Sequence, residues 1–210
     1  MLTKLEKRII EISFKKKISH ISSCLTAVNI IDNIYKRKKD NEPFILDNGH
    51  AAIALYCVLE KYFGINAEML FDKHGVHPNV DMKNRIWCST GSLAIGLGIG
   101  VGIALADRSK LCYILTSDGA MNEGLAWEAL RIAGELRLKN LRITCNANGF
   151  GAYSKINVDL LEKRLKMFFP VHVLRTNMRR YPKFLQAVTG HYTILNEKQY
   201  IEVLKMEQTL

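Results

Sequence analysis

The sequence lacks the paired cysteines of a disulfide framework or a zinc site. Only five of its 210 residues are cysteine, the number is odd, and none forms a Cys-x-x-Cys pair. They are scattered and stand mostly inside apolar runs, at Cys24, Cys57, Cys88, Cys112 and Cys145. Scattered apolar thiols are typical of reduced core residues, so we expect a cytoplasmic protein without disulfides.

A secretory signal and a membrane span are also missing from the pattern. The first twelve residues mix charged and apolar side chains, unlike the basic-then-apolar order of a signal peptide. The longest uncharged run, 88–106, contains five glycines. Its length approaches that of a membrane helix, but its small residues favour a buried helix pressed against a neighbouring backbone. We therefore expect no membrane association.

Acidic residues are scarce relative to basic ones. The chain has 20 acidic and 30 basic residues, a net charge of +10, and two compact basic runs at 15–17 and 36–39. Such runs are usually solvated faces, and a positive field also attracts phosphate-bearing ligands. The runs lack interleaved aromatic residues and no binding motif accompanies them, so nucleic acid is not an expected partner.

The sequence also contains no internal repeat, no low-complexity segment and no linker long enough to divide it. With 48% hydrophobic residues, 1–210 is expected to form a single domain. Apolar spacing predicts helices over 5–14, 25–35, 51–63, 123–138, 158–168, 181–188 and 197–206, and strands over 44–46, 111–116, 141–145 and 171–174. The alternation predicts an α/β fold with three layers, α/β/α, around a mostly parallel, doubly wound sheet.

The most informative polar residues follow two consecutive predicted strands. Asp118 and Gly119 come after the first strand, and Asn148 follows the second. Because the carboxyl ends of parallel strands share one sheet edge, these oxygen-bearing side chains are expected to lie together. Carboxylate and amide oxygens suit Mg²⁺, which usually completes its coordination with phosphates. Gly119 allows a phosphate to approach the backbone, so the pattern predicts a metal-bridged diphosphate site.

The blocks 117–124 and 146–149 resemble the thiamine diphosphate signature, and more closely the N-terminal, diphosphate-binding portion of transketolase. The resemblance runs from about residue 19 to residue 153. Its upstream blocks are Ser19-His20, Asn48-Gly49-His50, His77-Pro78 and Thr90-Gly91-Ser92-Leu93. Three features depart from the family pattern. Ser117 replaces the first glycine of the signature, Ile95 replaces a polar residue, and no later segment matches the one that brings a further histidine to the cofactor.

The resemblance implies two cofactors, thiamine diphosphate and Mg²⁺. Asp118, Asn148 and the backbone carbonyl of Phe150 would hold the metal. The implied chemistry is two-carbon ketol transfer between sugars or sugar phosphates, with the cofactor as electron sink.

Other residues take their expected roles from their positions in the matching blocks. His20 and His77 would orient the donor ketose or move protons to its hydroxyls. Beside Asp118 and Asn148, the expected cofactor contacts are His50, Gly91, Leu93, Gly119 and Ala120. His172 and His191 match nothing and are expected to be ordinary polar residues, and the turn-rich segment 72–83, which carries His74 and His77, is expected to be an exposed loop near the site.

The resemblance also implies a partner. In the family, the glutamate that activates the aminopyrimidine ring belongs to a second domain, for which this sequence has no room. The chain is therefore expected to be inactive alone, and to assemble with a separate C-terminal, pyrimidine-binding transketolase subunit, as two copies of each. Glu123 would lie at the interface between copies of this chain.

Two alternatives remain at this point. One is a subunit of another thiamine diphosphate-dependent synthase or decarboxylase. The other is a non-catalytic, basic binding module that keeps the fold, an interpretation favoured by Ile95 and by the missing histidine segment.

Overall fold

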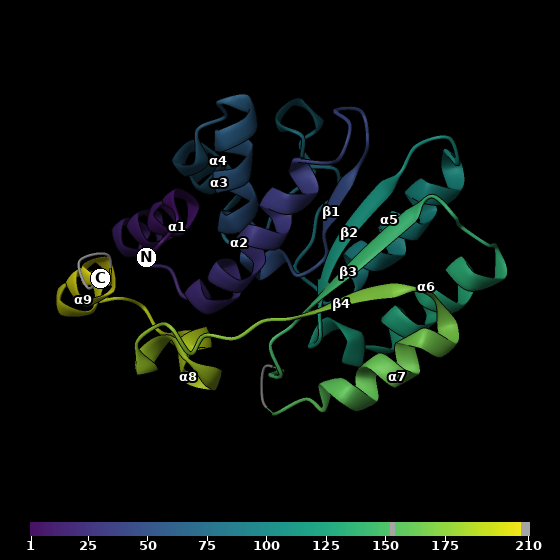
Figure 1. The fold of residues 1–210 in the computed structure, drawn as a ribbon. Coiled ribbons are helices and arrows are strands. Elements are labelled where there is room, and N and C mark those ends of the chain that lie inside the picture. The colour runs from purple at the N-terminus through teal and green to yellow at the C-terminus, as the bar shows by residue number, and fades with distance from the viewer. Residues whose placement is uncertain (152–153, 207–210) are drawn as a thin grey trace.

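A four-stranded parallel sheet forms the centre of the computed structural model, which describes residues 1–151 and 154–206 (Figure 1). The strands are β1 (Phe44–Leu46), β2 (Cys112–Ser117), β3 (Leu141–Ala147) and β4 (Val171–Arg175). They lie side by side in sequence order, and each neighbouring pair is parallel. The predicted parallel pairing of the strands before Asp118 and Asn148 is therefore confirmed.

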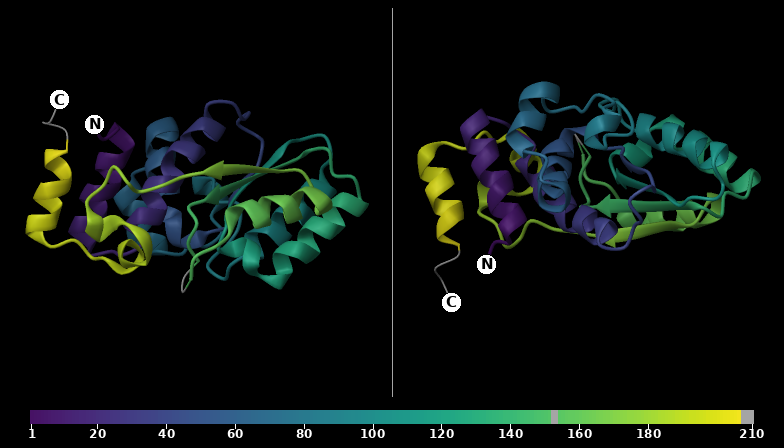
Figure 2. Two further views of the ribbon diagram at one scale, coloured as in Figure 1. Left: turned by 60° about the horizontal axis from the view of Figure 1, so that its bottom comes forward. Right: turned by 90° about the horizontal axis from the view of Figure 1, so that it is seen from above.

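Helices cover both faces of this sheet (Figure 2). The helices of the described residues are α1 (Lys4–Lys16), α2 (Ile21–Tyr35), α3 (Ala52–Phe63), α4 (Ala67–His74), α5 (Ile95–Ala106), α6 (Gly124–Glu135), α7 (Val158–Phe168), α8 (Ala187–Tyr192) and α9 (Glu197–Lys205). Of these, α1, α8 and α9 lie beyond one end of the sheet (Figure 1 and Figure 2). Alternate residues of β1 enter different cores: Phe44 and Leu46 pack with α1 to α4, and Ile45 packs with α5 to α7. The three-layer α/β class is thus confirmed. No helix in the described ranges is both long and apolar enough to cross a membrane.

Helix α4 is a difference from the sequence-based expectation, because 72–83 was expected to be an exposed loop throughout. The Asn66 side chain caps α4 by accepting a hydrogen bond from the Met69 amide at 2.9 Å, and Gly75 ends the helix with a φ of 72°. His74 is consequently the last helical residue. Its nearly buried ring lies 3.1 Å from Asp81 Oδ2, outside the cavity described below.

The predicted helix over 181–188 is also displaced. Pro182 precedes a single 3₁₀ turn over Lys183–Leu185, and Gln186 is extended, with φ −103° and ψ 157°. Because this extended residue interrupts the helix, α8 begins only at Ala187 and continues to Tyr192. This shift brings His191 into a helix that faces the sheet edge.

A buried carboxylate joins the end of β1 to the start of α5. Asp47 is fully buried; its Oδ2 accepts a hydrogen bond from Thr116 Oγ1 at 2.6 Å, and its Oδ1 accepts one from the Leu97 amide at 3.1 Å. A Cβ added to Gly96 would come 2.8 Å from Asp47 Cα. The glycine therefore allows α5 to press against the backbone after β1, as the glycine-rich run predicts.

The burial of Asp47 predicts a pH-dependent stability. Burial raises the pKa of Asp47 to about 6, although Thr116 and backbone amides favour the ionised form. Because an aspartate in the unfolded chain has a pKa of about 4, the folded state holds this proton more tightly. The resulting stabilisation is complete below about pH 4 and is lost as pH rises through about 6. Relative to Asp47→Asn, the wild-type free energy of unfolding should fall by about 2–3 kcal/mol over this window.

Urea denaturation of both proteins across that pH range measures the difference. Asp72→Asn is the matched control, because it changes an exposed carboxylate on α4 in the same way. The control should follow the wild-type pH dependence. A difference between wild type and Asp47→Asn that stays constant with pH contradicts the prediction.

Candidate functional site

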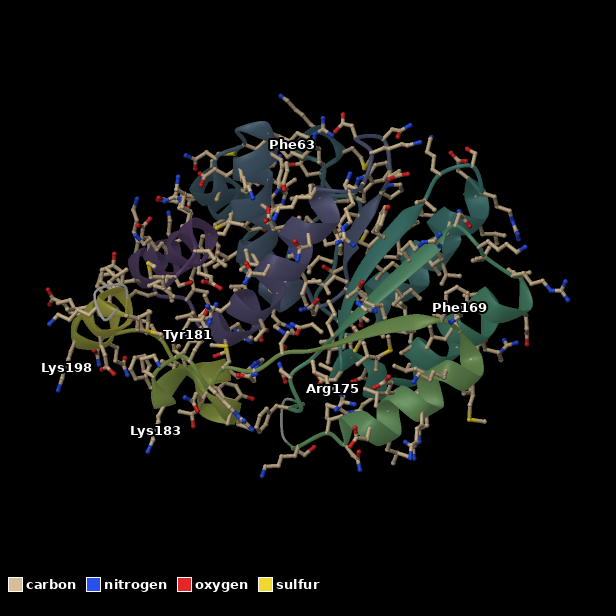
Figure 3. All side chains as sticks on the ribbon, in the orientation of Figure 1. Phe63, Phe169, Arg175, Tyr181, Lys183 and Lys198 are labelled. Atoms are coloured by element: carbon tan, nitrogen blue, oxygen red, sulfur yellow. The ribbon has the colours of Figure 1, made fainter. Side chains whose placement is uncertain are left out.

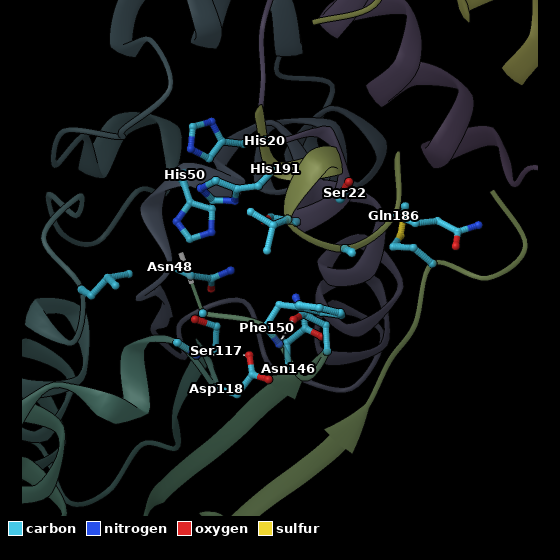
Figure 4. Close-up of a pocket in the computed structure, with 18 of the residues that line it drawn as sticks. His20, Ser22, Asn48, His50, Ser117, Asp118, Asn146, Phe150, Gln186 and His191 are labelled. Carbon is cyan, nitrogen blue, oxygen red and sulfur yellow. Dashed lines mark hydrogen bonds between the residues drawn. The ribbon is translucent and has the colours of Figure 1, made fainter. Parts of the chain in front are cut away.

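A cavity of about 460 Å³ lies along the carboxyl ends of the four strands (Figure 4). Each strand supplies a polar residue just beyond its end: Asn48, Asp118, Asn148 and Asn177. This is the edge at which open α/β sheets bind ligands. All predicted site residues except Ala120 line this cavity, namely His20, His50, His77, Gly91, Leu93, Asp118, Gly119, Asn148 and Phe150.

Asp118 is the buried acid of the cavity. It is fully buried, and its two oxygens accept backbone hydrogen bonds, Oδ1 from Gly119 at 3.1 Å and Oδ2 from Gly149 at 2.7 Å. No cationic side chain in the described ranges pairs with it. Burial is the main reason that the pKa of Asp118 rises to about 6, against the lowering effect of these amides. A cation bound here would compensate the charge.

The turn after β3 places two further oxygens near Asp118. Asn148 Oδ1 accepts a hydrogen bond from the Phe150 amide at 2.9 Å, and Gly149 has a φ of 85° that permits the turn. The Phe150 carbonyl oxygen lies 4.0 Å from the position of a Cβ added to Gly119. The three residues predicted to hold a metal, Asp118, Asn148 and Phe150, therefore lie together in the lining of the cavity.

Ser117 shows how the departure from the glycine signature is accommodated. It is the last residue of β2 and is not among the residues with positive φ, so its side chain imposes no backbone strain. Its Oγ accepts a hydrogen bond from the Ala120 amide at 3.2 Å. Ala120 is almost fully buried behind this turn and does not line the cavity, which differs from its expected position. Gly119, by contrast, does line the cavity.

Three imidazoles form the opposite wall (Figure 4). The ring centroids of His20 and His191 are 4.2 Å apart, and His50 lies 5.4 Å from His20 and 5.6 Å from His191. Burial, reinforced by the neighbouring histidines, lowers the pKa of His20 to about 4 and that of His50 to about 3. Burial also lowers the pKa of His191. Neutral rings of this kind can both donate and accept hydrogen bonds at neutral pH.

His20 occupies an unusual backbone position within this wall. It is the residue before α2 and has a left-handed backbone, with φ 64° and ψ 17°. Its Nδ1 lies 2.8 Å from Ser19 Oγ, and its backbone amide donates to the His191 carbonyl at 3.0 Å. These two contacts hold the imidazole toward the cavity.

His191 is a functional candidate that its sequence context does not predict, since it was expected to be an ordinary polar residue. The segment after β4, which matched no family block, nonetheless brings a histidine to the cavity. The only local signal is the dipeptide Gly190-His191, which repeats the Gly49-His50 pair. His172, by contrast, lies exposed on β4 and does not line the cavity, as expected.

The polar groups that line the cavity are of the kind that could bind a metal-bridged diphosphate. Asn48 is buried and lines the cavity, yet its Oδ1 has no hydrogen-bond partner within the described residues. Together with the uncompensated Asp118, this leaves polar groups that a ligand would satisfy. No group of three or more His, Cys, Asp or Glu side chains in 1–151 and 154–206 is placed to hold a metal. A metal at Asp118 would therefore need amide, carbonyl and phosphate oxygens, as Mg²⁺ accepts.

Parallel strands, a polar cavity at their carboxyl ends and converging oxygen donors define an α/β ligand-binding domain of the diphosphate-binding type. Residues 25–172 match the family model described as "Transketolase, thiamine diphosphate binding domain". The chain therefore belongs to the transketolase family through this domain, which confirms the resemblance drawn from its motifs.

Relatives in this family include both separate subunits and whole enzymes. One subunit of the apulose-4-phosphate transketolase of Phocaeicola vulgatus is 30% identical over 64% of this chain and 55% of its own length. A 6-deoxy-6-sulfo-D-fructose transketolase subunit of a Clostridium species is 26% identical over 85% of this chain and 69% of its own. Mouse transketolase is 33% identical over 71% of this chain, but only 28% of its own length is covered.

Solved transketolases share the fold. A transketolase variant from Pichia stipitis superimposes with a TM-score of 0.77 at 19% identity, covering 96% of this chain and 40% of the other. Transketolase from Leishmania mexicana gives 0.76 at 17% identity, covering 97% and 40%. The chain thus spans a minor part of these enzymes and about half of the Phocaeicola subunit.

Proposed function

We propose that this chain is the N-terminal subunit of a transketolase-like enzyme. It binds thiamine diphosphate and Mg²⁺ and takes part in two-carbon ketol transfer between sugars or sugar phosphates. The observation that carries the proposal is the buried carboxylate of Asp118, which lacks a cationic partner in the described chain and lies beside the Asn148 and Phe150 oxygens. The relatives named for a phosphorylated and a sulfonated sugar support the substrate class.

Each side of the cavity has its own task in this proposal. Asp118, Asn148 and the Phe150 carbonyl hold Mg²⁺, and His50 and the Gly119 backbone bind the diphosphate. The cofactor, when bound, supplies an electron sink for the ketose carbonyl carbon. His20 and His77, joined by His191, orient the sugar and exchange protons with its hydroxyls. The lowered pKa of His20 keeps its ring neutral at physiological pH, so the ring can accept a hydrogen bond from such a hydroxyl.

Calorimetric titration with thiamine diphosphate, with and without Mg²⁺, tests this function. We expect binding that requires the metal, by this chain alone or in complex with a pyrimidine-binding subunit. Absence of binding in both preparations contradicts the proposal and favours a non-catalytic module. Release of carbon dioxide from a 2-oxo acid donor, in place of ketol transfer, favours a related synthase or decarboxylase.

The proposed enzyme needs a second subunit. Two of the relatives are themselves named as transketolase subunits, and the Phocaeicola subunit is longer than this chain. On α5, an exposed or half-exposed face carries no charge and begins two residues after Leu93, which lines the cavity. This face consists of Ile95, Gly98, Ile99, Gly102 and Leu105. We propose that it contacts the partner subunit beside the cavity, with Glu123 nearby at the contact between copies of this chain.

The isolated chain should show no ketol transfer. With thiamine diphosphate, Mg²⁺ and a ketose phosphate donor, the purified chain is expected to be inactive, because the group that activates the aminopyrimidine comes from the partner. Addition of a pyrimidine-binding transketolase subunit that associates with it should restore turnover. Robust turnover by the isolated chain contradicts the two-subunit proposal.

The α5 face predicts a variant that dissociates the complex. Leu105→Asp places a charge on this face, where Leu105 is 43% exposed, and should weaken association with the partner at least about tenfold. Met167→Asp, at an 83% exposed residue of α7, is the matched control and should leave association unchanged. Light scattering of the mixed subunits measures both. Equal association of the two variants rules out this face.

A further inference from the structure

One wall of the cavity is built by residues 176–192, the stretch that leaves β4 and ends in α8. Asn177, Arg179, Gln186 and His191 of this stretch all line the cavity. The stretch lies beyond residues 25–172, the part of the chain that matches the family model. Its placement is set by contacts with both α2 and α1.

Contacts with α2 hold the far end of this stretch. The His20 amide donates to the His191 carbonyl at 3.0 Å, and Ser22 Oγ donates to the Leu185 carbonyl at 2.7 Å. Gly190 packs so tightly there that an added Cβ would overlap both Ser22 Oγ and the Leu185 carbonyl. The backbone around His191 is thus held against His20 and the first turn of α2.

The near end of the stretch is held by α1, which lies beyond one end of the sheet (Figure 1). Glu6 of α1 is fully buried, and its carboxylate accepts hydrogen bonds from the Thr3 amide at 2.8 Å and from Asn29 Nδ2 at 3.0 Å. The guanidinium of Arg180 also donates to the Glu6 carboxylate and forms an ion pair with it. Arg180 also donates to the hydroxyl of Tyr181, which is labelled in Figure 3, at 2.8 Å.

A second contact with α1 lies beyond His191. The rings of Phe14 on α1 and Tyr200 on α9 stack with centroids 4.1 Å apart and planes 7° from parallel. Helix α1 therefore contacts the chain on both sides of His191, at Arg180 and at Tyr200. Because α1 also lies outside the family match, the two unmatched ends of the described chain hold one another.

We propose that α1 is a positioning element for the cavity, in which Glu6 holds Arg180 and thereby keeps the wall formed by 176–192, and His191 with it, against His20. Only the functional role of His191 rests on the proposed function. Glu6 is fully buried, whereas the Arg180 side chain is 49% exposed, so the pair brings a surface cation onto a buried carboxylate. Leaving that carboxylate without its cation is costly, and this favours one placement of Arg180. The hydrogen-bond donors around Glu6 come from Thr3 at the start of α1, from Asn29 of α2 and from Arg180.

The test follows the histidine rings by NMR in protein labelled with ¹³C at histidine. The chain has six histidines, and exposed His172 serves as internal reference. In Arg180→Met, the His20 and His191 resonances should shift and the pKa of His20 should rise by about one unit or more, because the wall that buries it is released. The other titratable groups that face His20 are His50 and His77, and their resonances are followed in the same spectra.

Arg8→Met is the matched control. Arg8 is another arginine that fastens α1; it pairs with Glu60 and Glu68, and no hydrogen bond or ion pair of the described residues joins it to 176–192. It should leave His20 and His191 unchanged. Glu6→Gln, which keeps the shape of the side chain, should reproduce the effect of Arg180→Met, and Arg180→Lys should largely restore the wild-type spectrum.

Two results overturn the proposal. Either Arg180→Met and Glu6→Gln leave the two histidines unchanged, or Arg8→Met moves them equally. Calorimetry with thiamine diphosphate and Mg²⁺ on the same proteins separates this inference from the proposed function. If the wild-type chain and its complex fail to bind the cofactor, the function is wrong, and the histidine spectra still decide whether α1 positions the wall.

Discussion

Replacing Asp118 with Asn is expected to weaken Mg²⁺-dependent binding of thiamine diphosphate by at least about 100-fold. Asp118 is the sole carboxylate lining the cavity within the described chain, and its neighbours Asn148 and Phe150 offer neutral oxygens. An amide in its place keeps the size of the side chain and one acceptor oxygen but removes the charge. Mg²⁺ binds neutral oxygens alone poorly, so the metal and the diphosphate that it bridges are lost together.

The fold should survive this change. Burial already disfavours the ionised carboxylate, as the raised pKa of Asp118 shows, so a neutral amide removes an unfavourable buried charge. Without Mg²⁺, the free energy of unfolding of Asp118→Asn at pH 7.5 should equal or exceed that of the wild type. Calorimetry and urea denaturation on the same samples separate binding from folding.

Asp107→Asn is the control for the change in charge. Asp107 follows α5 and carries an exposed carboxylate that pairs with Lys110, outside the cavity. It should bind the cofactor as the wild type does. If Asp118→Asn retains Mg²⁺-dependent affinity within about threefold of the wild type, the metal site is placed wrongly.

The second large effect concerns two glycines of the same helix with opposite surroundings. A Cβ at Gly96 would come 2.8 Å from Asp47 Cα, a backbone atom that cannot move without displacing β1. A Cβ at Gly102 would meet nothing within 4 Å. Gly96→Ala should therefore lower the free energy of unfolding by about 2–3 kcal/mol through overpacking, whereas Gly102→Ala should raise it by up to about 1 kcal/mol through helix propensity.

Urea denaturation of the two single variants measures this contrast. Because both replace glycine by alanine within α5, the propensity gain is common to them and the difference reports the contact with Asp47. Equal changes in stability for the two variants contradict the close approach of α5 to the end of β1.

Much of the site was predictable because it depends on local order along the chain. The strand–helix–strand order around Asp118 and Asn148 makes the two strands parallel, and the carboxyl ends of parallel strands lie at one sheet edge. The structure bears out this convergence, and their metal-binding role stays a prediction. The glycine run in α5 likewise predicts close packing from residue size alone.

The parts that were not predicted depend on distant contacts. His191 reaches the cavity because Ser22 and His20 bind the backbone around it, and nothing in its own neighbourhood encodes those partners. His74 was expected near the site, but it is the last residue of α4, and its ring contacts Asp81 outside the cavity. Composition indicates a turn in that segment, whereas tertiary packing decides where the helix stops.

The left-handed backbone at His20 affects how its role can be measured. A residue with a Cβ pays about 1 kcal/mol or more in this conformation, whereas asparagine tolerates it better than most residues. An alanine variant would combine the loss of the ring with a change in backbone preference, and the start of α2 would carry part of the effect. His20→Asn, which suits the same backbone, is the cleaner probe, and kinetic losses in it can be attributed to the missing imidazole.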